Sequence, residues 1–380
     1  MGKRRGNSEG TIEEREGSWR CRVQVAGRRH SITGRTKAEV RKKLRELLSS
    51  ADKGVLPPSE RLTVAQFMER WLADVVKPAR RPSTYISYEQ NYRCYIGPEL
   101  GRVTLANLQP GHLRKLYASM TDGGLKAHTV RRCHAVLHTA LEQALSDGLV
   151  HRNVAHGLKG LPSVNAGAHE AMILSPMQVS QLLNAAMDGP YHALLTLAAY
   201  TGLRQGELLG LRWEDVDLDA GTLSVRQALS IRKQIGPPKS KAGIRSMTLP
   251  KVCVEALRAY KVLQTEVRLM SAEWNDTGLV FTTQRRGKGR GPDTLPGSPM
   301  TQSVVDRGFK RLLEVAGLPK LRFHELRHTA CSLMALQGVP ATVAMKRMGH
   351  SDIRLTLQVY THVLEQQDKD AAARLDALMG

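Results

Sequence analysis

Apolar and polar residues alternate near the start of the chain, and a period of two is typical of strands with one buried face. Residues 19–25 (WRCRVQV) alternate strictly, Ala26-Gly27 predicts a turn, and residues 28–33 predict a returning strand. Thr36 followed by Glu39 predicts the first turn of a basic helix that ends near Ser50. The block over residues 1–55 is therefore expected to be a small three-stranded sheet with one helix.

After Thr63 the apolar period changes to that of helices, and Thr63 with Gln66 forms a second capping pattern. Further helices are expected from Pro82 and over residues 110–120 and 127–146. Together they predict a helical domain over residues 61–160. The apolar stripe of its first helix consists of Val64, Phe67, Met68, Trp71, Leu72 and Val75.

A third block, residues 173–380, follows a linker and opens at Ser175-Pro176, a capping residue with proline at the first helical position. It is expected to be mostly helical, with strands at Thr222–Ile231 and Arg245–Leu249 and a candidate strand at Gly278–Thr283. The predicted fold class is therefore multidomain and mainly α, with small sheets in the first and third blocks.

The charge balance indicates a polyanionic partner. Lys and Arg number 56 against 35 Asp and Glu, which gives a formal net charge of +21. Nucleic acid is the leading interpretation and a membrane surface the second. No run of about 18 apolar residues predicts a membrane span, and the first residues, MGKRRGNSEG, have no apolar signal-peptide core. A soluble intracellular protein is expected.

Arginines in the first two blocks are candidate DNA contacts. Arg20 and Arg22 fall on one face of the predicted first strand, and Arg131 and Arg132 begin the helix over residues 127–146. A guanidinium-rich sheet face can enter a DNA groove. The alternative is that these arginines only keep a short basic element soluble.

The stretch His324-Glu325-Leu326-Arg327-His328 allows two interpretations. It fits H-E-x-x-H, the zinc-protease helix, and it also contains H-x-x-R, which can hold a phosphate. A zinc site needs neutral histidines and a third ligand, and Arg327 would place a fixed positive charge beside the metal. Cys331 has suitable spacing but would supply a thiolate. The phosphate interpretation is therefore favoured, and no metal site is expected.

Three other segments contain candidate site residues that are considered together with this stretch. Arg204 lies where an apolar helix, His192–Tyr200, gives way to a new amphipathic turn. Lys239 lies in a glycine- and proline-rich connection between two predicted strands. His350 follows a glycine, ten residues before Tyr360. Each residue alone has an ordinary structural explanation, but the combination is specific.

The set resembles the tyrosine recombinases, and its order and spacing are most similar to phage and conjugative-element integrases. By this resemblance the three blocks are an arm-type DNA-binding domain, a SAM-like core-binding domain and a catalytic domain. Arg152-Asn153-Val154 stands where relatives often have Asn-Pro, a departure that concerns packing. The segments that carry the resemblance are T-G-L-R-Q-G-E-L with Arg204, H-E-L-R-H-T with His324 and Arg327, M-G-H with His350, and V-Y-T-H-V with Tyr360.

The resemblance implies site-specific strand exchange through a Holliday junction. Tyr360 would attack the scissile phosphate and form a 3′-phosphotyrosyl link, leaving a free 5′-hydroxyl. A phenol has a pKa of about 10 and needs help to lose its proton. The resemblance assigns that help to His324, with His350 bonding the phosphate or orienting the site.

The resemblance also gives roles to the cations. Arg204 and Arg327 would bind the non-bridging phosphate oxygens. Lys239 would protonate the leaving 5′-oxygen, with Lys241 as a rival because the sequence reads P-K-S-K where many relatives have P-K-T. Bond energy is conserved in the phosphotyrosyl link, so neither ATP nor a metal ion nor another cofactor is expected.

The implied partners are double-stranded DNA with core-type and arm-type attachment sites, a homotetramer on that DNA, a DNA-bending host factor and an excisionase. The implied location is the nucleoid of the bacterial cytoplasm. The tail, Glu365–Gly380, is amphipathic and could dock on its own domain or on a neighbour. The alternatives are chromosome-dimer resolution or topoisomerase action, which the first block disfavours, a repressor without catalysis, and a zinc peptidase.

Overall fold

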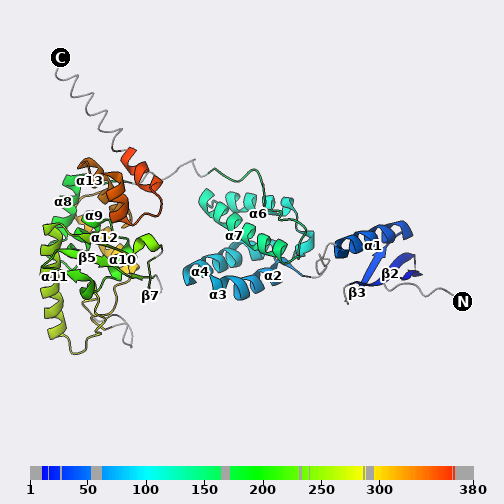
Figure 1. Ribbon diagram of the computed structural model, residues 1–380, viewed down its shortest axis with the longest axis horizontal. Helices are drawn as coiled ribbons and strands as arrows, with labels where there is room; N and C mark the ends of the chain where they lie inside the picture. Colours follow the sequence, from blue (N-terminus) through cyan, green and yellow to red (C-terminus); the bar gives the residue numbers. More distant parts are fainter. Residues whose placement is uncertain are drawn as a thin grey trace, which may run out of the picture. The chain divides into compact units, whose positions relative to one another are not determined.

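The computed structural model divides into two compact units, residues 1–168 and 169–380, and each is described by itself (Figure 1). No helix in the described part of the chain is both long and apolar enough to cross a membrane. The structure describes residues 11–15, 17–25, 28–52, 62–163, 172–230, 233–238, 240–285, 287, 295–361 and 363.

The first unit begins with a small antiparallel sheet in the order β1-β2-β3, as predicted. Cys21 and Val23 of the middle strand are buried with Val40 and Leu44 of the following helix. Arg22 is exposed on the other face, so the period of two separates an apolar face from a basic one. These elements are β1 (Thr11–Arg15), β2 (Ser18–Val25), β3 (Arg28–Gly34) and α1 (Lys37–Asp52).

The helical part of this unit begins as predicted, with Thr63 accepting a hydrogen bond from the Gln66 N–H at 3.2 Å. The apolar stripe is buried up to Leu72, but Val75 is 37% exposed and Val76 only 3%. The inclusion of Val75 was therefore wrong. Residues 71–76 form a π-helix, whose wider turn shifts the buried position by one residue.

The helices of this part bury one continuous core. The four helices predicted from the sequence begin where they were expected, at residues 64, 82, 110 and 127. Tyr85, Tyr88, Tyr92 and Tyr95 are partly buried and pack against this core. The elements are α2 (Val64–Arg70), η1 (Trp71–Val76), α3 (Lys77–Ala79), α4 (Pro82–Asn91), η2 (Tyr92–Ile96), α5 (Gly97–Leu100), η3 (Leu105–Asn107), α6 (Pro110–Asp122) and α7 (Ala127–Ser146).

The second unit is helical with two small sheets, one in the order β4-β5-β8 and one a β6-β7 hairpin. Ser175 caps its first helix as predicted. Residues 354–361 are also helical. The named elements are α8 (Pro176–Ala185), α9 (His192–Thr201), α10 (Gln205–Leu209), η4 (Trp213–Asp215), β4 (Val216–Asp217), β5 (Thr222–Val225), β6 (Ala228–Leu229), β7 (Ile235–Gly236), η5 (Lys241–Gly243), β8 (Arg245–Thr248), α11 (Lys251–Met270), α12 (Gln302–Val315), α13 (Glu325–Leu336) and α14 (Ala341–Met348).

Two strand predictions need correction. The strand expected over residues 222–231 is two short strands, and the strand expected over residues 278–283 consists only of isolated bridges at Leu279 and Thr282. In the second case the Gln264 amide donates to the carbonyls of Leu279 and Val280, at 3.2 and 2.9 Å. A side chain therefore satisfies acceptors that a strand ladder would otherwise use.

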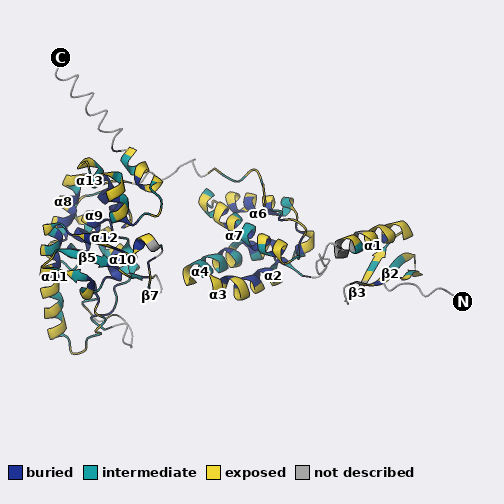
Figure 2. Ribbon diagram, in the orientation of Figure 1, coloured by how far each residue is buried: buried dark blue, intermediate teal, exposed yellow. Residues whose placement is uncertain are grey.

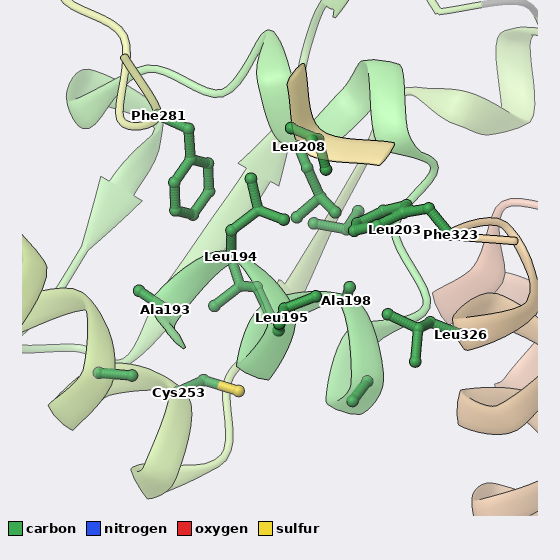
Figure 3. Packing of buried hydrophobic residues seen from close by; sticks show 14 of the residues in the cluster. Ala193, Leu194, Leu195, Ala198, Leu203, Leu208, Cys253, Phe281, Phe323 and Leu326 are labelled. Carbon is green, nitrogen blue, oxygen red and sulfur yellow. The ribbon is translucent and has the colours of Figure 1, made fainter. Parts of the chain in front are cut away.

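The core of the second unit is built around α9, which packs against α8, α10, α11 and α13 (Figure 1). Figure 2 shows buried residues where these helices face one another and exposed ones on their outer faces. Because α9 is apolar on all sides, it is buried over nearly its whole length. Figure 3 shows Leu194 among Phe281, Leu203 and Leu208. This packing holds the end of α9 in place, and it thereby fixes the position of the residues that follow the helix.

Leu194→Ala should destabilise the second unit by about 2–5 kcal/mol, because it leaves a cavity beside a helix that is packed on every side. Leu194 is 0% exposed. Chemical denaturation followed by tryptophan fluorescence measures the change. The matched control, Leu269→Ala at a residue that is 81% exposed, should change stability by less than about 0.5 kcal/mol. Equal effects of the two substitutions would contradict the assigned core.

Candidate active site

Arg204 is positioned by the turn that ends α9. Gly202 takes the left-handed conformation, with φ +64°, which a residue with a side chain rarely adopts. A Cβ on Gly202 would also collide with the sulfur of Met348. The chain then extends through Arg204, which precedes the first residue of α10. Glycine is thus required for the reversal that places Arg204 at the junction of two helices.

A buried carboxylate holds Arg204 in place. Glu207 accepts hydrogen bonds from Arg204 Nη1 at 2.7 Å and from Arg245 Nη2 at 2.9 Å. Burial alone would raise the pKa of Glu207, but the guanidinium groups of Arg245 and then Arg204 outweigh it and hold that pKa below its ordinary value. Glu207 is therefore a fixed negative charge between two fixed positive ones.

Arg327 binds the ends of two helices. It is 5% exposed and donates to the carbonyls of Gly202 and Met348, both at 2.6 Å. Arg204 Nη2 donates to the next carbonyl, that of Gly349, at 3.0 Å. Burial, followed by the charge of Arg204, lowers the pKa of Arg327, but a guanidinium stays protonated in neutral water. The two arginines are therefore fixed on neighbouring peptide groups.

Gly349 allows the end of α14 to lie close to Arg245. It ends α14 with φ +64°, and a Cβ there would lie 2.8 Å from Arg245 Nη1 and 2.9 Å from the Ala242 carbonyl oxygen. Only glycine allows the backbone to approach Arg245 so closely. His350 follows directly, so the glycine also determines where this imidazole is placed.

The two histidines are neutral bases near these cations. Burial, followed by the charges of Arg327 and Arg204, lowers the pKa of His350 to about 4. Loss of hydration, followed by His328 and Arg327, lowers the pKa of His324, at the exposed start of α13, to about 4. His350 Nδ1 lies 2.8 Å from Thr356 Oγ1. At neutral pH both rings can accept a proton.

The zinc-peptidase interpretation of residues 324–328 finds no support in the placement of Glu325. This carboxylate is 1% exposed and accepts from the Arg322 N–H at 2.6 Å and from Arg322 Nη2 at 3.2 Å. It stabilises the turn before α13. A peptidase base would instead have to face bound substrate and water.

Tyr360 lies in the last described helix, and its hydroxyl donates to the Val339 carbonyl at 2.8 Å. Burial, followed by Cys331, raises the pKa of this phenol. Within the described residues, Tyr360 forms no hydrogen bond to the site histidines or arginines. The structure thus brings together Arg204, Arg327 and the two imidazoles, with the phenol bonded to a backbone carbonyl.

Some candidates are only partly described. Lys239, which was expected in the connection between the two predicted strands, lies outside the described residues. The backbone of Lys241 is described in η5, but its side chain is not. The tail from Glu365 is also outside the described residues.

Arg245 is a residue of the site that the sequence reasoning missed. It is 9% exposed and donates to the carbonyls of Arg347 at 2.6 Å and Gly243 at 2.9 Å, as well as to Glu207. A signal was present, because Arg245 shares the inward face of β8 with the buried Met247. A charged residue at an inward strand position indicates a buried ion pair.

The candidate DNA contacts of the first unit differ in their surroundings. Arg22 and Arg132 are exposed. Arg20 Nε donates to Ser31 Oγ at 2.7 Å, and Arg131 Nε donates to the Pro162 carbonyl at 2.8 Å. The guanidinium groups of Arg20 and Arg131 thus each have a contact within the protein, and their substitution would remove it.

Glu207→Gln should destabilise the second unit by about 3 kcal/mol, because it leaves Arg204 and Arg245 without their buried counter-charge. Urea denaturation of the purified variant measures the loss. Glu214 is a suitable control, since its bond to Arg212 is 3.4 Å long and its side chain is 67% exposed. Glu214→Gln should cost less than about 1 kcal/mol, and a loss equal to that of Glu207→Gln would be evidence against the central role of Glu207.

The histidines should make the free protein less stable in mild acid. Their folded pKa values of about 4 lie below the ordinary value of about 6.5, so the unfolded chain binds more protons between these limits. Their contribution to stability is present above about pH 6.5 and is lost as pH falls towards 4. The double variant His324→Gln/His350→Gln should therefore show a shallower fall in unfolding free energy over this window. Equal slopes in repeated urea titrations would refute the shift.

Comparison with known sequences supports one family. Residues 173–367 match the model of the phage integrase family, and residues 63–121 match its N-terminal SAM-like domain. A protein described as "Tyrosine recombinase XerC-like" from Caldanaerobacter subterraneus is 29% identical and covers 92% of each chain. An integrase of Saccharopolyspora erythraea is 26% identical and covers 95% of this chain and 94% of its own.

Solved structures show the same fold. The integrase of transposon Tn1549, in complex with transposon right-end DNA, is 21% identical with a TM-score of 0.66, covering 83% of this chain and all of that one. A lambda integrase tetramer bound to a Holliday junction is 19% identical with a TM-score of 0.59, covering 94% and 96%. Since the family match covers more than half of the 380 residues, this chain belongs to the phage integrase family of tyrosine recombinases.

Proposed function

We propose that this chain is an integrase, a site-specific recombinase that cuts and rejoins DNA strands through a 3′-phosphotyrosyl link to Tyr360. The observation that carries the proposal is the fixed pair Arg204 and Arg327, with two neutral imidazoles beside it. Through cycles of such transfer and a Holliday junction, it would integrate and excise a mobile element.

The arginines suit a phosphodiester. Within the described residues, the bonds of Arg204 to Glu207 and Gly349, and those of Arg327 to Gly202 and Met348, use two side-chain N–H groups each. A guanidinium has five such groups. In the proposal, the three remaining donors of each guanidinium bond the non-bridging oxygens, from positions that the protein contacts hold before DNA binds.

The chemical step needs a nucleophile, a base and an acid. The Tyr360 oxygen would leave the Val339 carbonyl and bond to phosphorus while its proton passes to the neutral ring of His324. The P–O5′ bond would break, and Lys239 would give a proton to the leaving oxygen. His350 would bond a phosphate oxygen. In the second half, a 5′-hydroxyl of the partner duplex would attack the phosphotyrosine and restore the tyrosine.

The remaining parts would organise the DNA. We assign residues 1–55 to arm-type DNA, residues 61–160 to core-type DNA and residues 173–380 to catalysis. The exposed face that carries Arg22 supports the first assignment. The tetramer of lambda integrase on a Holliday junction supports four copies of this chain at synapsis. A DNA-bending host factor, an excisionase and action at the bacterial nucleoid complete the proposal.

Tyr360→Phe should abolish the covalent adduct, because only the hydroxyl oxygen can bond to phosphorus. The parent and the variant are incubated in EDTA with nicked duplexes that carry the ends of the element encoding the chain, and a denaturing gel reveals protein-linked DNA. Tyr200→Phe is the control, since Tyr200 is in the same unit and is 39% exposed. The control should form as much adduct as the parent. Undiminished adduct with Tyr360→Phe would overturn the proposed nucleophile.

A further inference from the structure

A second cluster of chemically active side chains lies in the helical part of the first unit, and strand transfer does not use it. His138, Glu142 and His156 each offer one ligand atom, and these atoms all lie within 4.8 Å of one another. His138 and Glu142 are one turn apart on α7, with His138 Nε2 3.8 Å from Glu142 Oε1. The rings of His138 and His156 have their centroids 6.0 Å apart.

The cluster is held together by a buried amide. Asn153 is 7% exposed, and its Nδ2 donates to Glu142 Oε1 at 2.7 Å and to the His138 carbonyl at 3.1 Å. Its Oδ1 accepts from the Ala155 N–H at 2.9 Å. Its own carbonyl accepts from the His156 N–H at 3.1 Å. One side chain thus orients the carboxylate and fixes the segment that carries the second histidine.

We propose that His138, Glu142 and His156 bind a zinc ion. Two imidazole nitrogens and one carboxylate oxygen form a donor set typical of zinc, and Mg²⁺ and Ca²⁺ prefer oxygen alone. Tetrahedral zinc with ligand distances of about 2.0–2.1 Å places neighbouring ligand atoms about 3.3 Å apart. The 3.8 Å between His138 and Glu142 needs only a small side-chain rotation to reach that spacing.

Surrounding features fit this ligand. Asn153 supplies the outer hydrogen bond to a coordinating carboxylate that zinc sites usually contain. Glu142 and His156 are exposed and His138 is half-buried, so an ion can enter without opening the core. A water molecule would complete the four ligands.

The ion would act on the structure and not on phosphoryl transfer. It would join α7 to the segment after it, which is already attached further along by the bond from Arg131 Nε to the Pro162 carbonyl. Zinc should therefore stabilise the helical part of the first unit. Strand transfer would need no zinc, so the two proposals can fail independently.

The direct test is a calorimetric titration of ZnCl₂ into the full chain, freed of metal with EDTA and dialysed. The parent should bind one Zn²⁺ with a raised melting temperature, and MgCl₂ should give no binding at the same concentration. His156→Ala should weaken the zinc affinity at least tenfold, because it removes one of three protein ligands. The matched control is His128→Ala, an exposed histidine at the start of the same helix, and it should bind as the parent does.

A second variant separates lost coordination from lost folding. His156→Cys should restore zinc binding, because a thiolate is also a good zinc ligand, and Co²⁺ bound to it should show the visible absorption of a tetrahedral site. Parent-like zinc binding by His156→Ala, or no zinc binding by the folded parent, would overturn the proposal. Adduct formation in EDTA should be the same in His156→Ala and the parent, and a loss there would overturn the assignment of a purely structural role.

Discussion

The candidate active site depends on one buried negative charge. Glu207 binds Arg204 and Arg245, and Arg245 in turn holds the carbonyl of Arg347 near the end of α14. Arg327 lies near the same carboxylate without bonding to it, so three guanidinium groups stand against one carboxylate, a formal excess of two positive charges (3 − 1). In the proposed reaction, that excess would stabilise a phosphate whose charge grows in the transition state. Without Glu207, mutual repulsion would separate the arginines before any DNA arrived.

Helix ends supply the other half of this arrangement. The carbonyls of Gly202, Met348 and Gly349 lie at the C-termini of α9 and α14, where unpaired acceptors concentrate partial negative charge. The arginines bind these acceptors, so the fold uses its own backbone to fix the site. Both glycines are required by backbone conformation and close approach. Their presence in the T-G-L-R and M-G-H segments therefore reflects geometry as well as chemistry.

Local rules predicted much of the fold and part of the site. Caps at Thr63 and Ser175 and the helical stripes depend on neighbours within one turn, which a sequence displays directly. The bonds of Gln264 to residues 279–280 and of Arg245 to Glu207 join positions 15–16 and 38 residues apart. Such features arise only when distant segments meet, so periodicity did not reveal them.

The hydrogen bond from the Tyr360 hydroxyl to the Val339 carbonyl bears on when this phenol can react. If Tyr360 is the nucleophile, as proposed, a hydroxyl that donates its proton to a peptide carbonyl would not at the same time donate it to an imidazole, and the phenol would not be activated before DNA binds. A hydrogen bond of this kind contributes about 0.5–1.5 kcal/mol net, a difference of about tenfold or less in population. A bond of this strength is weak enough for binding of the correct DNA to break it, and under the proposed mechanism it would disfavour cutting of DNA that is bound only transiently. The bond between Tyr360 and Val339 would therefore be present while the protein searches along a chromosome and absent when it cuts the DNA.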